Sequence, residues 1–64
     1  MMLWEPITLA EVKEGDVVRV NQIELITVQR VVTRDALQVT VLDQHGRERI
    51  LHHSHHLTRQ AWAP

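Results

Sequence analysis

The chain contains no cysteine, phenylalanine or tyrosine, so it can form neither a disulfide nor a thiolate metal site. No apolar run approaches the roughly 18 residues of a membrane-spanning helix. The first residues do not combine a basic segment with an apolar run, so no signal peptide is predicted. We therefore expect a cytoplasmic protein that is stabilised by an aliphatic core or by self-association.

The 64 residues predict one domain, residues 1–64. A chain of this length retains only a few kcal/mol of net stability, because ordering its backbone costs roughly 1–2 kcal/mol per residue. Its apolar residues are mainly valine, isoleucine and leucine. The abundance of β-branched side chains favours strands over helices.

Only one short helical segment is indicated, near the N-terminus after an extended stretch that ends at Pro6. Thr8 and Glu11 have the spacing of a capping box, in which the glutamate reaches back to the N-cap backbone. Gly15 can take the left-handed conformation that ends a helix. The pattern predicts a helical turn over residues 8–14.

Five strands follow in the hydropathy pattern. The second of them, residues 23–33, loses its alternation at Val31 and Val32, which predicts a bend near Gln29–Arg30. Turns are predicted at Asn21–Gln22, at Arg34–Asp35 and at residues 43–46, where Gly46 can adopt positive φ. The strands are expected over residues 16–20, 23–33, 37–42, 47–52 and 57–62. Their expected core consists of Val18, Val20, Ile26, Val28, Leu37, Val39, Val41 and Ile50.

This order of a helical turn, a Gly-Asp-Val-Val segment at residues 15–18, a long bent strand and a hairpin at Gly46 resembles small SH3-like barrels, including KOW-type modules. The resemblance implies a mainly β fold, a small five-stranded antiparallel barrel with one N-terminal helical turn. It also implies binding of RNA, DNA, peptides or protein subunits. The aromatic groove of signalling SH3 domains has no counterpart, since tyrosine and phenylalanine are absent.

Charge is unevenly distributed along the chain. Residues 1–24 carry five acidic and two basic side chains (−5 + 2 = −3), whereas residues 25–64 carry five basic and three acidic ones (+5 − 3 = +2). This predicts either one cationic face or charges that interleave once the strands fold. Arginine suits bidentate contacts with phosphate or carboxylate. The candidate binding residues are Arg30, Arg47, Arg49, Arg59, His52 and His56, with Arg47, Arg49 and Arg59 expected on adjacent strands.

Four histidines lie within five residues, at positions 52, 53, 55 and 56. Imidazoles are common ligands of zinc, nickel and copper, and they titrate near neutral pH. On a strand, however, His52 and His53 would point to opposite faces. We interpret the cluster as a polar turn and predict no bound metal. The alternatives are a metal site, whose candidate ligands would be His52, His53, His55 and His56, and a pH switch.

Catalysis is not predicted. Ser54 with a neighbouring histidine and Asp43 is the only hydrolytic set suggested by the sequence, and a triad is recognised by geometry rather than by proximity in sequence. No glycine-rich phosphate loop is present. No cofactor is expected. Trp4 and Trp62 are expected either to cap the core where the first and last segments meet or to stack on a nucleobase.

The first functional hypothesis is a non-catalytic adaptor that docks on a protein, as in an assembly factor, a regulatory complex or a phage or bacterial accessory protein. The second is a nucleic-acid-binding barrel that uses the arginine and histidine side chains. The third is a metal- or pH-responsive protein that uses the histidine cluster. Self-association fits any of them, and no membrane partner is expected.

Overall fold

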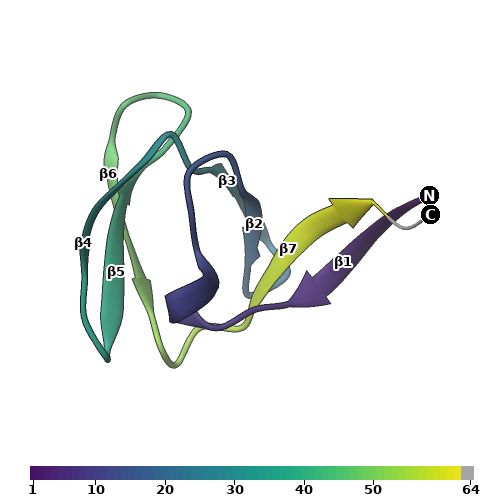
Figure 1. The fold of residues 1–64 in the computed structure, drawn as a ribbon, viewed down its shortest axis with the longest axis horizontal. Helices are drawn as coiled ribbons and strands as arrows, with labels where there is room; N and C mark the ends of the chain where they lie inside the picture. The colour runs from purple at the N-terminus through teal and green to yellow at the C-terminus, as the bar shows by residue number, and fades with distance from the viewer. Residues whose placement is uncertain (63–64) are drawn as a thin grey trace.

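The computed structural model describes residues 1–62, which form seven strands and one 3-10 turn (Figure 1). Among these residues, no helix is long and apolar enough to cross a membrane. The elements in chain order are β1 (Met2–Pro6), η1 (Leu9–Glu11), β2 (Val17–Val20), β3 (Glu24–Thr27), β4 (Arg30–Arg34), β5 (Gln38–Leu42), β6 (Glu48–His52) and β7 (Leu57–Trp62).

The strands form two antiparallel sheets, one with the order β1-β7-β2-β3 and one with the order β4-β5-β6. The prediction of a mainly β domain with one N-terminal helical turn is confirmed. The predicted count of five strands is wrong, because the extended N-terminal stretch pairs as β1 and residues 23–33 split into β3 and β4. Within residues 1–62 the two sheets stay open, without closing into a barrel.

The chain passes from one sheet to the other at Val28 and Gln29, so the bend predicted near Gln29–Arg30 is confirmed. The Val28 N–H donates to the Asp16 carbonyl at 2.8 Å, in the first sheet, and the Gln29 N–H donates to the Leu42 carbonyl at 2.8 Å, in the second. The pairing of β4 with β5 then shifts between Val31 and Thr33. This irregularity is the β-bulge that the broken alternation indicated.

Nine aliphatic side chains form the core between the sheets, and six of the eight predicted core residues are among them. Leu37 and Ile50 are instead 59% and 56% exposed, so their prediction was wrong. Leu37 lies in the turn before β5, and Ile50 lies on the outer face because Leu51 pairs with the buried Val39. The core residues are Val12, Val18, Val20, Ile26, Val28, Val39, Val41, Leu51 and Leu57.

The turns predicted at Asn21–Gln22 and at residues 43–46 are confirmed by the backbone angles. The turn predicted at Arg34–Asp35 lies later, at residues 35–38, because Arg34 still pairs with Val39. Gly15 and Gly46 have φ of 91° and 74°, and Asn21 and Gln22 have φ of 51° and 62°. Two consecutive positive values and the hydrogen bond from the Ile23 N–H to the Val20 carbonyl describe a tight hairpin turn of the I′ kind. Local residue chemistry therefore decides where the chain reverses.

The helical turn is shorter than predicted, three residues instead of residues 8–14. Glu11 does reach back, and its carboxylate accepts a bond from the Thr8 N–H at 3.0 Å. The next residue, Val12, has an extended backbone (φ −65°, ψ 127°) and is fully buried. The turn ends there because Val12 enters the core.

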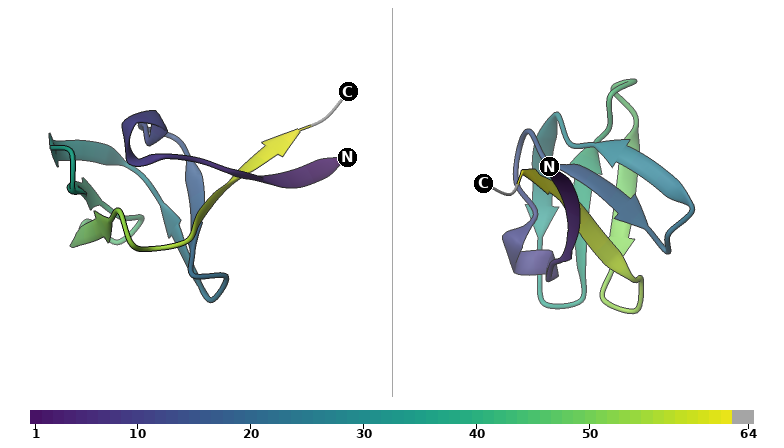
Figure 2. Two further views of the ribbon diagram at one scale, coloured as in Figure 1. Left: turned by 90° about the horizontal axis from the view of Figure 1, so that it is seen from below. Right: turned by 90° about the vertical axis from the view of Figure 1, so that its right-hand side faces the viewer.

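The outer parts of β1 and β7, beyond the residues of β7 that pair with β2, project from the body as a two-stranded arm, defined here as residues 2–4 and 60–62 (Figure 1; Figure 2). Met2 and Trp62, which lie opposite each other, are the outermost paired residues of this arm. Neither tryptophan belongs to the buried core: the Arg19 guanidinium lies 4.0 Å from the ring centre of Trp4, and Trp62 is 76% exposed. The expectation that a tryptophan caps the core was therefore wrong, because the parts of β1 and β7 that carry Trp4 and Trp62 lie outside it.

Candidate functional site

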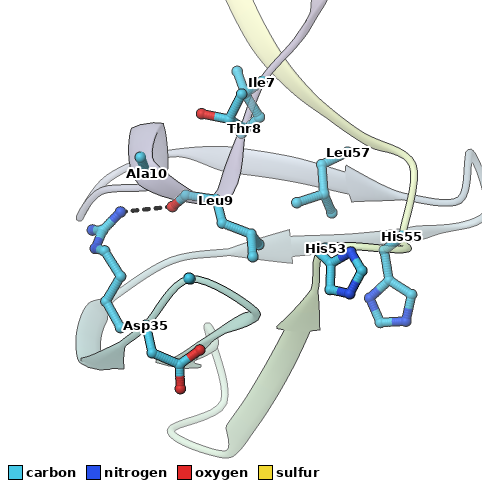
Figure 3. A pocket seen from close by; sticks show the side chains of 10 residues that line it. Ile7, Thr8, Leu9, Ala10, Asp35, His53, His55 and Leu57 are labelled. Carbon is cyan, nitrogen blue, oxygen red and sulfur yellow. Dashed lines mark hydrogen bonds between the residues drawn. The ribbon is translucent and has the colours of Figure 1, made fainter.

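An open hollow of about 590 Å³ lies between the helical turn, the turn from β4 to β5 and the link from β6 to β7. Figure 3 shows side chains from these three segments facing the same space. We call it the groove. Its residues are Ile7, Thr8, Leu9, Ala10, Arg34, Asp35, Ala36, His53, His55 and Leu57.

Two charged residues of the groove are occupied in holding its walls together. The Arg34 guanidinium donates to the Leu9 carbonyl at 2.6 Å and to the Val12 carbonyl, which ties the helical turn to β4. The Asp35 carboxylate accepts bonds from the N–H groups of residues 37 and 38 at 2.8 and 2.9 Å. These backbone bonds lower the pKa of Asp35. What the groove offers a ligand is therefore mainly its aliphatic floor and its imidazoles.

The histidine link is a tight turn with local hydrogen bonds. The His52 N–H donates to Nδ1 of His55 at 3.0 Å, and Nδ1 of His52 lies 2.9 Å from the Ser54 hydroxyl. The rings of His52 and His53 lie 4.3 Å apart. Among the described residues, no group of three histidine or carboxylate side chains is arranged to hold a metal ion.

The backbone N–H of His56 donates to the Asn21 side chain at 2.8 Å, beside the β2–β3 turn. Of the four histidines, only His53 and His55 line the groove. The rings of His53 and His55 both lie close to the ring of His52, at 4.3 and 6.1 Å between ring centres.

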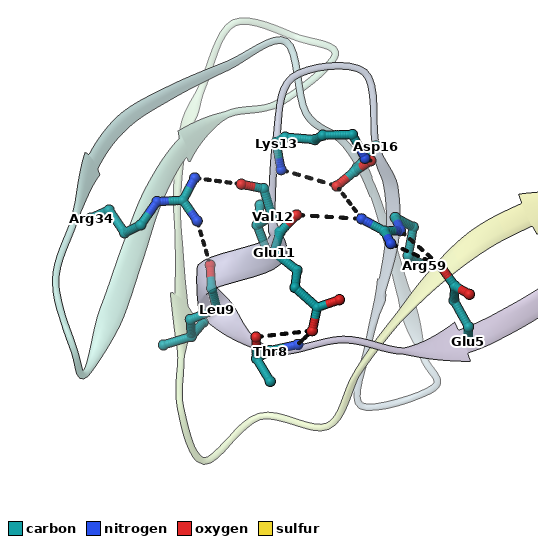
Figure 4. A network of polar contacts seen from close by, with 9 residues as sticks. All are labelled: Glu5, Thr8, Leu9, Glu11, Val12, Lys13, Asp16, Arg34 and Arg59. Carbon is teal, nitrogen blue, oxygen red and sulfur yellow. Dashed lines mark hydrogen bonds and ion pairs between the residues drawn. The ribbon is translucent and has the colours of Figure 1, made fainter.

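Two of the predicted binding arginines form ion pairs with acidic residues from the N-terminal part of the chain. Arg59 lies 2.8 Å from the Glu5 carboxylate and 3.4 Å from that of Asp16 (Figure 4). Arg49 pairs with Glu24 and lies 3.6 Å from the Asp43 carboxylate. These carboxylates raise the pKa of both arginines. The charge distribution predicted either one cationic face or charges that interleave, and at Arg49 and Arg59 the opposite charges interleave.

The expected stripe of Arg47, Arg49 and Arg59 on adjacent strands was wrong. β6 and β7 belong to different sheets, and Arg49 shares the inward side of β6 with Leu51 rather than pointing outward. Arg30 and Arg47 are exposed and form no ion pair with any residue between 1 and 62. Arg47 and Arg49 remain neighbours in the β5–β6 hairpin, but Arg59 lies in the other sheet, so the three do not form one cationic stripe.

The hairpin between β5 and β6 is organised by a buried carboxylate. Asp43 is 2% exposed and accepts bonds from the N–H groups of His45 and Arg47 at 2.8 and 3.0 Å. These bonds, with that of Arg47 the strongest influence, lower its pKa. The sequence indicated this turn, but it did not indicate that the aspartate would be buried.

The groove itself was not predicted. Its residues come from three segments that are separated along the chain, and Ala36 and Arg34 carry no local signal of a site. Leu9 lines the groove from the helical turn. It packs against the core as a partly buried side chain.

Comparisons with known proteins add no information about the function of this chain. No family model, no curated protein and no solved structure matches this chain. Any function must therefore be argued from the geometry of the groove and of the surfaces around it.

We expect acid to destabilise the fold progressively as the pH falls below about 4, the ordinary range of carboxyl groups. The pKa values of Glu11, Glu24, Asp35 and Asp43 are lowered by their bonds to Thr8, to Arg49 and to backbone N–H groups. A lowered pKa means that the unfolded chain binds protons first, so the contribution is complete above the unfolded pKa and is lost below it.

Urea midpoints measured between pH 6 and pH 2.5 test this expectation. Asp43→Asn is the comparison variant, since it keeps an acceptor oxygen for the turn but removes one of the four carboxylates, and its midpoint should fall less steeply with acid. A wild-type midpoint that stays constant down to pH 2.5 would contradict the expectation.

Proposed function

We propose that this chain is a non-catalytic protein-interaction module that binds a segment of a partner protein in the groove. The observation that carries the proposal is the combination of an open, mainly aliphatic hollow with wall residues that are already hydrogen-bonded to their own backbone. Charged groups that are bonded in this way maintain the shape of the groove. A ligand would therefore bind mainly through apolar contacts.

The dimensions of the groove suit a short extended segment. Hollows of roughly 300–1,000 Å³ accommodate a drug-sized ligand or a few side chains. Ile7, Leu9 and Leu57 supply aliphatic surface for an apolar side chain of the partner, and the imidazoles of His53 and His55 supply polar contacts beside it. We infer an occupant with one or two aliphatic side chains flanked by hydrogen-bonding groups.

The resemblance to SH3-like barrels supports the same class of function, since such domains mostly bind other macromolecules. As part of this proposal we regard the fold as related to that barrel, opened into two sheets. The support for the relationship is the bent strand pair β3–β4, which passes from one sheet to the other. Fold alone does not select a ligand, so the groove carries the functional argument.

Ala36→Glu tests the proposal. Ala36 is exposed at the groove, so a longer charged side chain should leave the fold intact while obstructing an apolar ligand. A partner is first captured with the wild-type chain and purified, and its affinity is then measured by calorimetry. We expect Ala36→Glu to weaken binding at least tenfold.

The matched control is Thr33→Glu, the same added charge at an exposed position of β4 that does not line the groove. It should bind the partner as the wild type does. Equal affinity of Ala36→Glu and the wild type would reject the groove as the binding site. Salt-dependent binding of oligonucleotides that is weakened by Arg49→Ala would instead favour the nucleic-acid alternative.

A further inference from the structure

The projecting arm carries exposed apolar residues that do not line the groove and have no role in the function proposed above. Its outer strand, β1, has no neighbouring strand on its free side among the described residues. Three large apolar side chains of the arm are exposed: Met2 (41%) and Leu3 (44%) on β1, and Trp62 (76%) on β7. An isolated pair of strands is only marginally stable in water, so such an arm gains from being covered.

The edge of β1 also differs from the other three free edges in charge. β3 carries Glu24, β6 carries Glu48 and Arg49, and β4 carries arginine at both ends and an irregular register. Charges and bulges of this kind protect edges against pairing with another strand. Residues 2–4 of β1 have none, and the charge that follows them, on Glu5, is already paired with Arg59.

The register of β1 shows which backbone groups face outward. The Ile7 N–H donates to the Leu57 carbonyl at 3.2 Å, and these residues continue the ladder in which Pro6 lies opposite Thr58. Because hydrogen-bonding directions alternate along an antiparallel strand, the odd residues face β7 and the even residues face the free edge. Met2 and Trp4 thus present N–H and C=O groups outward, whereas Pro6 has no N–H and ends the ladder.

We propose that this edge pairs with the same edge of a second copy of the chain, antiparallel about a two-fold axis at Leu3. In this register Met2 of each copy lies opposite Trp4 of the other, and both residues exchange both of their outward hydrogen bonds. A shift that instead sets Met2 opposite Pro6 leaves the Met2 carbonyl without a donor. Pairing joins the two four-stranded sheets into one.

The side chains also meet favourably in this arrangement. Opposite residues share a face, so Trp62 lies beside Met2 on the same face of the arm. Across the axis Met2 then adjoins Trp4 of the other copy, and Leu3 meets Leu3 on the opposite face. Such apolar cross-strand pairs are the contacts that stabilise paired strands.

The area involved predicts a reversible dimer. A tryptophan buries about 150–250 Å², so the exposed part of Trp62 with those of Met2 and Leu3 offers roughly 200–300 Å² of apolar surface per copy. The apolar area that two copies could bury together is therefore below the roughly 1,200 Å² of a standard interface. We therefore expect weak, reversible association that is lost on dilution.

Sedimentation equilibrium at several concentrations of the wild-type chain measures the association. We expect Leu3→Lys to weaken it at least tenfold, because two ammonium groups would face each other at the axis. The control is Ile23→Lys, the same charge at an 88% exposed aliphatic residue beside another edge, which should associate as the wild type does. Circular dichroism verifies that each variant is folded.

The absence of cysteine allows a direct test of the register. Residues opposite each other at a non-hydrogen-bonded position have Cβ atoms about 4.5–5.5 Å apart, close enough for a disulfide after small adjustment. Leu3→Cys should therefore form a covalent dimer on mild oxidation, and Leu25→Cys, on the β3 edge, should not. A wild type that is monomeric at every concentration would overturn the proposal, as would faster cross-linking of Leu25→Cys.

Discussion

Replacing Leu51 with alanine should destabilise the fold by about 2–4 kcal/mol, the range for large aliphatic side chains removed from a core. Leu51 is 1% exposed and lies opposite the fully buried Val39 in the pairing of β5 with β6. The remaining side chains of so small a core have little freedom to fill the space. Since the whole domain is stabilised by only a few kcal/mol, much of the protein should be unfolded at 25 °C.

The adjacent residue is the matched control. Ile50 has the same number of side-chain carbons as Leu51 but is 56% exposed, on the outer face of β6. Ile50→Ala should therefore cost less than about 1 kcal/mol. Urea denaturation followed by circular dichroism gives both values. A larger effect at Ile50 than at Leu51 would mean that β6 is turned the other way.

Arg34→Met should destabilise the fold by about 1–2 kcal/mol. The guanidinium is the clamp between two parts of the molecule, because it donates to the carbonyls of Leu9 and Val12 from the end of β4. Hydrogen bonds that involve a charged group contribute about 1.5–3 kcal/mol each when buried, and less here because Arg34 is an exposed residue. The variant should also bind the partner more weakly, since loss of the guanidinium frees the helical turn, which forms one wall of the groove.

Arg30→Met provides the control for this prediction. Arg30 lies at the other end of the same strand, is exposed and forms no ion pair with any described residue. Its replacement should change stability by no more than about 0.5 kcal/mol. If the two variants unfold at the same urea concentration, the contacts of Arg34 with the helical turn contribute nothing to stability.

The positions of the turns were predictable because each depends on a few neighbouring residues. Gly15 and Gly46 were expected at positive φ, and Asn21 was expected in a two-residue turn, and all three occupy those conformations. The bend near Gln29 was also predictable, because two consecutive valines break a period of two. In each case the responsible interaction is local.

The orientation of β6 was not predictable in the same way. Ile50 and Leu51 are adjacent and almost equally apolar, so alternation alone cannot decide which one points inward. Pairing with β5 decides it, because Leu51 lies opposite Val39. Leu37 was misplaced for a related reason: it follows the alternation of β5 but lies in the turn that the Asp35 carboxylate organises.

The candidate sites depended even more on long-range pairing. Arg59 is neutralised by Glu5, which lies 54 residues away in sequence, and Arg49 is neutralised by Glu24. No local pattern connects such residues, so the sequence suggested a cationic stripe that the fold separates into ion pairs. The groove likewise combines three segments that come together only when both sheets are formed.

By itself, the sequence determined that the domain is mainly β, where the chain turns and which alternating valines are buried. These properties follow from backbone preferences and from a hydropathy period that acts over a few residues. The tertiary structure decided that β1 pairs with β7, that Leu51 rather than Ile50 fills the core, and that the arginines are paired. The physical reason is that strand register and ion pairing depend on residues far apart in the chain, whose encounter is settled by the packing of the whole domain.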